Sequence, residues 1–461
     1  MTALIEGTYF ISILSFLGGL KFLSNPKKAK LGNTIAAIGM IMAILISVFS
    51  FQNQVLSSTN YMLITIMLVV GTLIGRSLSN KVEMTEMPQL VSFFNATGGA
   101  CAFLLGISEA NQFNDYSSVE KLILLLGTVT GAIAASGSIV ALRKLSGKLK
   151  DKRTVLLKIS SKTALVCIVT LIVCASIGIF NFSIIQYTIA LVLISLLYGV
   201  LFVLPIGGAD MPVVISLLNA VTGIATSFAG ALYSNKVMLA GGIIVGAAGI
   251  LLTVMMCRAM NRSLWKVLTG SFKATTASLV GDEEQHIVET SISETALQLS
   301  LAKKVAIIPG YGLAVAQAQH LCKQIEKLLT EKEIEVHYII HPVAGRMPGH
   351  MNVLLAEAAV EYNVLKEMDE VNDEMNTYDL ALIIGANDVV NPAAEQNSDS
   401  PIYGMPIIKA YKCASSVVLK RGMSKGYAGV QNELFNTKTC KLLFGDAKHS
   451  LQQIINELKL V

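Results

Sequence analysis

Hydrophobic residues gather in the first 257 residues of the chain, in runs of about 20 that short polar segments separate. A run of that length is what an α-helix needs to cross a hydrocarbon core about 30 Å thick. The pattern therefore predicts nine membrane-spanning helices rather than the buried core of a soluble protein. They are expected at about residues 3–23, 33–52, 60–79, 88–107, 120–142, 161–180, 184–204, 211–232 and 236–257.

The rest of the chain changes character twice. Hydropathy falls after Ser263, where Thr275–Glu284 is small and acidic and Ile292–Lys303 fits a short amphipathic helix, which is typical of a linker. From Lys304 onward, apolar runs alternate with helical patterns, which indicates a parallel sheet covered on both faces. The expected strands are Val305–Ile308, Val336–Ile340, Val364–Met368, Leu380–Ile384, Ile407–Ala410, Ser416–Leu419 and Lys441–Phe444, and the expected helices are Leu313–Thr330, Met351–Tyr362 and Ala447–Lys459.

These patterns predict a multi-span α-helical membrane bundle followed by an α/β Rossmann-like domain, a doubly wound parallel sheet. The expected limits are residues 1–262 for the membrane domain, 263–302 for the linker and 303–461 for the sheet domain. Pairs of small residues four apart, at Gly71/Gly75, Gly127/Gly131 and Gly242/Gly246, are expected to let neighbouring helices approach closely.

Basic residues indicate how the bundle is oriented. One alternate set of loops holds Lys21, Lys27, Lys28, Lys30, Arg76, Lys81, the cluster from Arg143 to Lys162, Arg258 and Arg262, whereas the other set holds only Lys121 and Lys236. Because cytoplasmic loops are the basic ones, we expect the N-terminus outside and the sheet domain in the cytoplasm. The net charge of +5 is then a topology signal and not a nucleic-acid patch, and the seven cysteines form no metal-like cluster.

A glycine turn follows the first expected strand, in Lys304–Gln319. Gly310 and Gly312 permit a tight turn and close approach of a dinucleotide pyrophosphate to a helix N-terminus, while Val315 stands where a third glycine is common. The degraded motif gains weight from its place between a strand and a helix. The sequence therefore predicts a dinucleotide-binding turn.

Two further segments bear on which dinucleotide is bound. The second strand ends at His341-Pro342, without the carboxylate that holds the ribose 2′-hydroxyl of NAD. Lys420-Arg421 ends a later strand before a glycine-rich loop, and a guanidinium with an ammonium suits a 2′-phosphate. This favours NADP, although a solvated basic pair would show the same spacing.

Several long blocks together resemble the proton-translocating nicotinamide nucleotide transhydrogenases, in particular the beta subunit of the split bacterial form. They are residues 309–319, 341–352, 385–394 and 420–432, together with 81–88, 207–213 and 260–263, so the match covers essentially the whole chain. The resemblance implies that this chain binds NADP(H), in the reverse orientation to ordinary Rossmann enzymes. It also implies that an alpha subunit binds NAD(H), and that hydride transfer between the two is coupled to proton translocation, normally driving NADPH formation.

The resemblance also implies the contacts. They come from Tyr311, Val343, Ala344, Gly345, Arg346, Met347, Pro348, Gly385, Ala386, Asn387, Asp388, Val389, Gly404, Met405, Lys420, Arg421, Gly422, Met423, Ser424, Lys425, Gly426, Tyr427, Asp446 and Ala447. Among these, Asp388 is a candidate proton-coupling switch; a turn-capping role is the alternative. His341 and His350 flank the Arg346 segment and are expected to orient it.

Polar residues inside predicted spans are costly and are usually functional. Asn95, Asp210 and Asn219 are therefore candidates for a proton path. All six histidines lie outside the membrane part, and asparagine does not titrate, so the obvious proton carrier is missing. Either the partner subunit supplies an ionisable residue, or water ordered by the asparagines carries protons to Asp210; a purely interhelical role for both asparagines is the third option.

The expected setting is a bacterial inner membrane, with the chain in a dimer of alpha–beta units and active only with its partner. The chief alternative is a channel or transporter with a cytoplasmic nucleotide-sensing domain. That class predicts an acidic residue after the second strand and a carbonyl-lined filter, and the sequence has neither. A structural anchor with a vestigial nucleotide fold would not need Arg346 and the Lys420-Arg421 pair.

Overall fold

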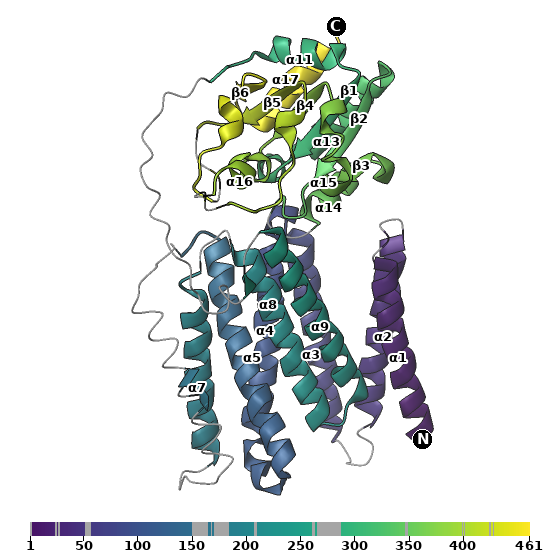
Figure 1. Cartoon of the computed structure of the whole chain (residues 1–461). Coiled ribbons are helices and arrows are strands. Elements are labelled where there is room, and N and C mark those ends of the chain that lie inside the picture. The colour runs from purple at the N-terminus through teal and green to yellow at the C-terminus, as the bar shows by residue number, and fades with distance from the viewer. Residues whose placement is uncertain are drawn as a thin grey trace. The chain divides into compact units, whose positions relative to one another are not determined.

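The chain forms two compact units in the computed structural model (Figure 1). One comprises residues 1–207 and 214–253, and the other comprises residues 208–213 and 254–461. The structure describes residues 2–23, 25, 28–50, 57–149, 165, 166, 168, 169, 184–206, 210–260, 263, 264, 287–345, 349–398, 400, 402–423, 426 and 428–461.

The first unit is helical. Its described helices are α1 (Thr2–Leu23), α2 (Ala29–Ser50), α3 (Ser58–Lys81), α4 (Met87–Glu109), α5 (Ser118–Leu145) and α7 (Ile184–Val203), together with most of α8 (Met211–Leu232) and of α9 (Lys236–Ala259). Each coincides with a predicted span. Within the described ranges seven of them, all but α1, are long and apolar enough to cross a membrane. The predicted span at 161–180 lies mostly outside the described residues.

Small residues let some of these helices touch. A Cβ on Gly131 of α5 would lie 2.9 Å from the carbonyl oxygen of Gly99 in α4, so only glycine allows this approach. Likewise, a Cβ on Gly242 of α9 would lie 2.7 Å from the carbonyl oxygen of Gly223 in α8. Gly71 and Gly75 contact no other described helix of this chain, because an added Cβ there would meet no described residue within 4 Å and α3 buries none of its described residues.

The second unit contains a sheet of six parallel strands in the order β3-β2-β1-β4-β5-β6. The strands are β1 (Lys304–Pro309), β2 (Glu335–Ile340), β3 (Leu365–Glu367), β4 (Leu380–Ile384), β5 (Ser415–Lys420) and β6 (Cys440–Phe444). Val305 of β1 pairs with Val336 of β2 on one side and with Leu380 of β4 on the other. The strand order therefore reverses between β1 and β4, which is where doubly wound sheets open a crevice.

Helices flank this sheet. They include α11 (Ile292–Leu301), α12 (Tyr311–Val315), α13 (Gln319–Glu331), α14 (His350–Glu357) and α17 (Ala447–Leu458). β1 and β4 are buried along almost their whole length, as strands covered on both faces must be. This confirms the predicted fold class.

The predicted helix Leu313–Thr330 is broken in two. α12 ends after five residues because Gln317 takes the left-handed conformation, with φ +49°. The amide of Ala318 then donates to the carbonyl of Leu313, and the amide of Gln317 donates to the carbonyl of Ala314. This is the Schellman termination, which glycine normally provides. A glutamine at that position gives no sequence signal, so the periodicity was wrongly extended through it. The expected helix at Met351–Tyr362 is also shorter and ends at Glu357.

The predicted strand at Ile407–Ala410 is wrong. Its backbone groups make hydrogen bonds to partners that are not in a neighbouring strand. The amide of Ile408 donates to the carbonyl of Val389. The side chain of Asn372 donates to the carbonyl of Ile407 and accepts from the amide of Lys409. The extended segment is thus held by a side chain instead of a neighbouring strand.

Residues 287–301, within the predicted linker, lie against the sheet. The amide of Leu442 donates to the carbonyl of Val288 at 2.8 Å, and the amide of Thr290 donates to the carbonyl of Leu442 at 3.0 Å. α11 then packs on α17. The domain limits of 1–262, 263–302 and 303–461 stay a prediction.

Candidate functional site

The candidate site lies at the carboxyl edge of the sheet, around the loops that follow β1 and β4. The amide of Gly310 donates to the carbonyl of Ile384, and the amide of Gly312 donates to the carbonyl of Gly385, both at 2.9 Å. Gly385 itself has φ +64°. The loops after the two central strands are therefore joined backbone to backbone, and glycine is needed on both sides.

The glycine turn differs from the expected one in the length of its helix. α12 has only five residues, so no long helix begins at Gly310, and Val315 is the last residue of α12 with 45% of its surface exposed. A Cβ on Gly310 would lie 2.4 Å from the backbone nitrogen of Ala386. In this structure the two glycines are accounted for by the neighbouring loop.

The loop after β5 lies on the loop after β4. Asp388 accepts a hydrogen bond from the amide of Ala428 at 2.9 Å, and a Cβ on Gly426 would lie 2.3 Å from Asp388 Oδ1. The side-chain amide of Asn432 donates to the carbonyl oxygen of Asn387 at 2.9 Å. The predicted segment at residues 385–389 and the block at residues 420–432 are thus brought together by polar contacts.

The basic pair at the end of β5 divides between two partners. The ammonium of Lys420 lies 4.4 Å from the centre of the Phe435 ring, and partial burial lowers the pKa of Lys420. The guanidinium of Arg421 is exposed and pairs with Asp446 at 2.8 Å. Both cations remain at the same sheet edge.

Asp446 also begins α17. Its Oδ1 accepts hydrogen bonds from the amides of Lys448 and His449, at 3.0 and 3.3 Å, as an N-cap does. The backbone hydrogen bond from His449 is the main reason why the pKa of Asp446 is lowered, and the charge of Arg421 adds to it. Asp446 therefore holds Arg421 against the start of a helix, and the adjacent Ala447 is buried.

His341 links the loop after β2 to the segment at 404–406. Its Nδ1 accepts from the amide of Val343 at 3.2 Å, which leaves Nε2 to carry the proton and donate to the carbonyl of Pro406 at 2.8 Å. Burial lowers the pKa of His341 to about 4, so the ring is neutral near pH 7. The buried Met405 and the turn at Gly404, with φ +78°, are thereby tied to Val343.

His350 lies under the same loop. It is 1% exposed, and a Cβ on Gly345 would lie 2.6 Å from its Nδ1, so the ring packs against a glycine with φ +100°. Ala344 is buried beside it. The predicted contacts Arg346, Met347, Pro348, Ser424, Lys425 and Tyr427 lie outside the described residues.

Sequence reasoning missed three residues that organise the site. Asn391 accepts from the amide of Glu433 and donates to the carbonyl of Gln431, Asn432 binds Asn387, and Phe435 lies under Lys420. The two asparagines sat inside matching blocks without being singled out. The only available signal was the density of asparagine beside glycine, which indicates side-chain-to-backbone hydrogen bonds in loops.

The proposed membrane residues lie in different surroundings. Asn95 of α4 is 5% exposed, and its backbone oxygen accepts a hydrogen bond of 3.5 Å from Thr222 of α8. Among the described residues, the side-chain nitrogen of Asn95 has no hydrogen-bond partner. Asn219 is half-buried on α8, three residues before Thr222, so both asparagines come from helices in contact. Asp210 is 3% exposed at the start of α8.

Helices of membrane-spanning length and a parallel sheet with glycine loops after its two central strands define the class: a membrane protein with a Rossmann-like domain. Residues 5–457 match the model of the family "NAD(P) transhydrogenase beta subunit", and the chain belongs to that family. Proteins named "NAD(P) transhydrogenase subunit beta" from Rhodospirillum rubrum and from a defined strain of that species are each 39% identical over 472 positions, covering 99% of both chains.

This membership has direct consequences. It supports the enzyme family, implies that nicotinamide nucleotides are bound by the complex, and implies an alpha subunit as partner. It does not support the alternative of a channel with a nucleotide sensor.

Proposed function

We propose that the sheet unit binds NADP(H) at its carboxyl edge, with the residues predicted from the sequence forming the contacts. The observation that carries this proposal is the meeting of the basic β5 loop with the glycine loop of β4, through Asp388 and Ala428. Cations and a tight backbone crevice thereby converge on one edge, as a phosphorylated dinucleotide requires.

The residues present fit such a ligand. Arg421 is exposed, Lys420 is half-buried beside it, and a Cβ on Gly422 would meet no described residue within 4 Å. Two cations side by side suit a 2′-phosphate, which a guanidinium binds in a bidentate manner. Lys420 and Arg421 would hold the phosphate, and the loops carrying Tyr311 and Asn387 would flank the dinucleotide. When bound, NADP(H) supplies the hydride acceptor or donor.

The second reactant is NAD(H) on the alpha subunit. The described residues contain one doubly wound sheet, which supports a single dinucleotide site in this part of the chain and a partner that supplies the second site. We propose that two alpha–beta units form a dimer in a bacterial inner membrane, with the N-terminus periplasmic and the sheet unit cytoplasmic. The distribution of basic residues between alternate loops supports this orientation.

Proton translocation supplies the driving force. NADH and NADPH have nearly equal reducing power, so hydride exchange alone favours neither product. A proton falling through about 150 mV releases roughly 3.5 kcal/mol, which shifts a concentration ratio by a few hundred-fold. Coupling requires the affinity for NADP(H) to depend on a protonation state, which is thermodynamic linkage. Asp388 is the proposed switch, since its carboxylate holds the β5 loop.

The proposed proton path includes Asn95, Asn219 and Asp210. The buried side-chain nitrogen of Asn95 has no partner among the described residues, which supports a role for ordered water or for a residue of the partner subunit. Replacing both asparagines by alanine in reconstituted vesicles should reduce proton pumping. Undiminished pumping would remove them from the path.

The proposal as a whole is tested with the chain purified together with its alpha subunit and inserted in vesicles. NADPH formation from NADH should rise when a proton gradient is imposed, and isothermal calorimetry should show binding of NADP in preference to NAD. Rates that ignore the gradient would refute the coupling, and equal affinities for the two nucleotides would refute the assignment of NADP.

A further inference from the structure

A carboxylate at one end of the helical unit has an unusual set of partners. Glu109 is the last residue of α4, and its two oxygens accept short hydrogen bonds from two tyrosines: Tyr233 at 2.6 Å and Tyr116 at 2.7 Å. Tyr233 follows α8, and Tyr116 precedes α5. One carboxylate therefore joins the ends of three helices.

The two lysines that follow Tyr233 and Tyr116 in the sequence have other partners. Lys236 binds Glu6, and the ammonium of Lys121 lies 5.4 Å from the centre of the Phe113 ring. In the part of the chain that the structure describes, no cation lies within 4 Å of the Glu109 carboxylate. Besides Glu6, the acidic groups Asp115 and Glu120 lie nearby in the sequence, and both act on Tyr116. Glu109 is thus held by neutral donors instead of an ion pair.

Helix capping does not account for Glu109. Glu120 illustrates that role: it lies in the first turn of α5 and accepts from the amide of Ser117, completing a capping box. Glu109 instead lies at the C-terminal end of α4, where the helix dipole opposes a negative charge. The two tyrosine hydroxyls offset that repulsion.

Both tyrosines remain donors over the range in which the protein works. Desolvation and then the hydrogen bond to Glu109 raise the pKa of Tyr116 to about 12, and the same causes raise the pKa of Tyr233. A fixed pair of O–H donors can therefore stabilise the carboxylate and yet accept its proton, because a hydroxyl oxygen also has lone pairs.

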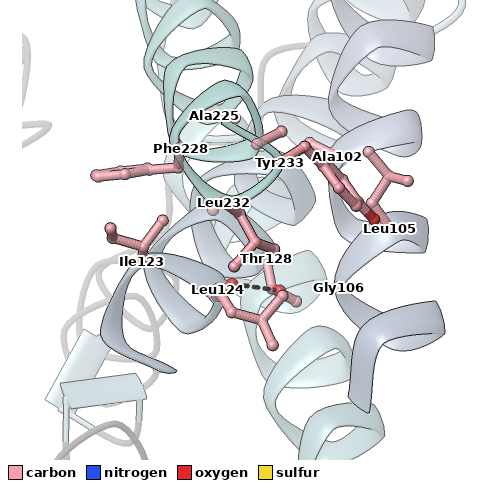
Figure 2. Close-up of a pocket in the computed structure, with 12 residues that line it drawn as sticks. Ala102, Leu105, Gly106, Ile123, Leu124, Thr128, Ala225, Phe228, Leu232 and Tyr233 are labelled. Atoms are coloured by element: carbon pink, nitrogen blue, oxygen red, sulfur yellow. Dashed lines mark hydrogen bonds between the residues drawn. The ribbon is translucent and has the colours of Figure 1, made fainter. Parts of the chain in front are cut away.

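Tyr233, which binds Glu109, is also one of the residues that line a small pocket in the helical unit (Figure 2). The pocket lies between α4, α5 and α8, and Gly106, Thr128, Phe228, Leu232 and Tyr233 are among the residues around it. Its volume of about 10 Å³ is near the minimum for one water molecule. The other hydroxyl there belongs to Thr128, which donates to the carbonyl of Leu124 at 2.7 Å and keeps its lone pairs for a further donor.

We propose that Glu109 is the proton-loading group at this face of the membrane unit, which the charge pattern predicts to be periplasmic. This inference rests on the proposed proton translocation. A proton from bulk water binds a Glu109 oxygen; the O–H bond then breaks and the proton passes along Tyr233 to water in the pocket, leaving the carboxylate ready again. Each transfer breaks one O–H bond and forms another, and no electron moves.

The test uses the complete alpha–beta complex in vesicles, with gradient-driven NADPH formation recorded against the pH on the face carrying Glu109. In the Glu109→Gln variant the rate should fall at least tenfold and lose its dependence on that pH, because the amide cannot be protonated. Glu109→Asp should restore part of both. The matched control is Glu120→Gln, which removes a carboxylate from the same face and should keep the pH profile.

The tyrosines separate proton transfer from simple helix clamping. Tyr233→Phe should slow gradient-driven turnover several-fold more than Tyr116→Phe, because only Tyr233 borders the pocket. Equal effects of the two variants would mean that Glu109 only ties the helices together and would overturn the inference. So would a wild-type rate and pH profile in a correctly assembled Glu109→Gln complex. If the wild-type complex itself ignores the gradient, the proposed function fails first.

Discussion

The amide of Gly312 donates a 2.9 Å hydrogen bond to the carbonyl oxygen of Gly385, and a Cβ on Gly385 would lie only 2.3 Å from the Cα of Gly312. The loops after β1 and β4 are therefore in backbone contact at the point where the strand order reverses. This contact holds the two loops together at the sheet edge, because neither loop can move away without breaking the hydrogen bond between them.

Replacing either glycine by alanine should therefore destabilise the sheet unit. At Gly385 the left-handed backbone adds strain to the steric clash, so Gly385→Ala should cost on the order of 1–3 kcal/mol. Thermal unfolding of the full chain in detergent should show a melting temperature lower by several degrees. Gly422→Ala adds the same methyl group where nothing lies within 4 Å, and should leave the melting temperature nearly unchanged. Equal shifts for both variants would contradict the close-contact explanation.

Substitutions of Asp388 can distinguish the effect of its hydrogen bond to the Ala428 amide from the effect of its negative charge. Asp388→Asn keeps an oxygen that can accept from the amide of Ala428, whereas Asp388→Ala removes the acceptor. Hydrogen exchange at the Ala428 amide should therefore quicken in the alanine variant and stay close to wild type in the asparagine variant. If Asp388 is the coupling switch, both variants should lose proton-coupled turnover. A fully coupled Asp388→Asn enzyme, with unchanged pH dependence of NADP release, would leave Asp388 only its structural role.

His341 should make the stability of the sheet unit depend on pH. Its folded-state pKa of about 4 lies below the ordinary value of 6.5, so the unfolded chain binds more protons between these two values. The contribution of the neutral His341 ring to the free energy of unfolding is complete above pH 6.5. It is lost as the pH falls toward 4, and the loss amounts to at most about 3 kcal/mol. As the pH is lowered from 8 to 4, the melting temperature should fall less steeply for His341→Gln than for wild type.

The matched control for that experiment is His320→Gln, which removes an exposed imidazole from α13 and should keep the wild-type slope. His337 is half-buried with a lowered pKa and contributes in the same direction, so some slope should survive in His341→Gln. Identical slopes in wild type and His341→Gln would show that the Val343 and Pro406 contacts tolerate a protonated ring.

The fold could be predicted from the sequence wherever burial in the membrane or in the sheet produces a regular pattern of apolar residues. Spans and buried strands are long, uniform patterns, so the limits of α8 and β4 agree with prediction to the residue. Failures came where a single polar side chain overrode the pattern. Gln317 ended α12 in a left-handed turn, and Asn372 took the backbone bonds of the expected strand at 407–410. Such events depend on tertiary position, which no local period encodes.

The candidate site was predictable in outline for a different reason. Parallel strands place their carboxyl ends on one edge, so residues after β1, β4 and β5 had to meet once the strands were known. The links within that edge could not be foreseen, because they join residues about 40 positions apart: Asp388 with Ala428, and Asn387 with Asn432. Sequence identified the segments, and the structure shows the hydrogen bonds that join them.

The basic pair after β5 gives the sharpest test of nucleotide choice. Arg421→Gln and Lys420→Met should each weaken NADP binding about 10–100-fold, or about 1.4–2.7 kcal/mol, because each removes one cation from the 2′-phosphate. NAD lacks that phosphate, so its affinity should not change. The loss of the exposed Arg421–Asp446 pair should cost less than about 1 kcal/mol of stability. Lys327→Met, which breaks an exposed pair with Glu331 on α13, is the control and should bind NADP like wild type. Calorimetry on the full chain measures the nucleotide affinities of all three variants. An equal loss of NAD affinity would mean that Lys420 and Arg421 hold the loop in shape and do not bind the 2′-phosphate.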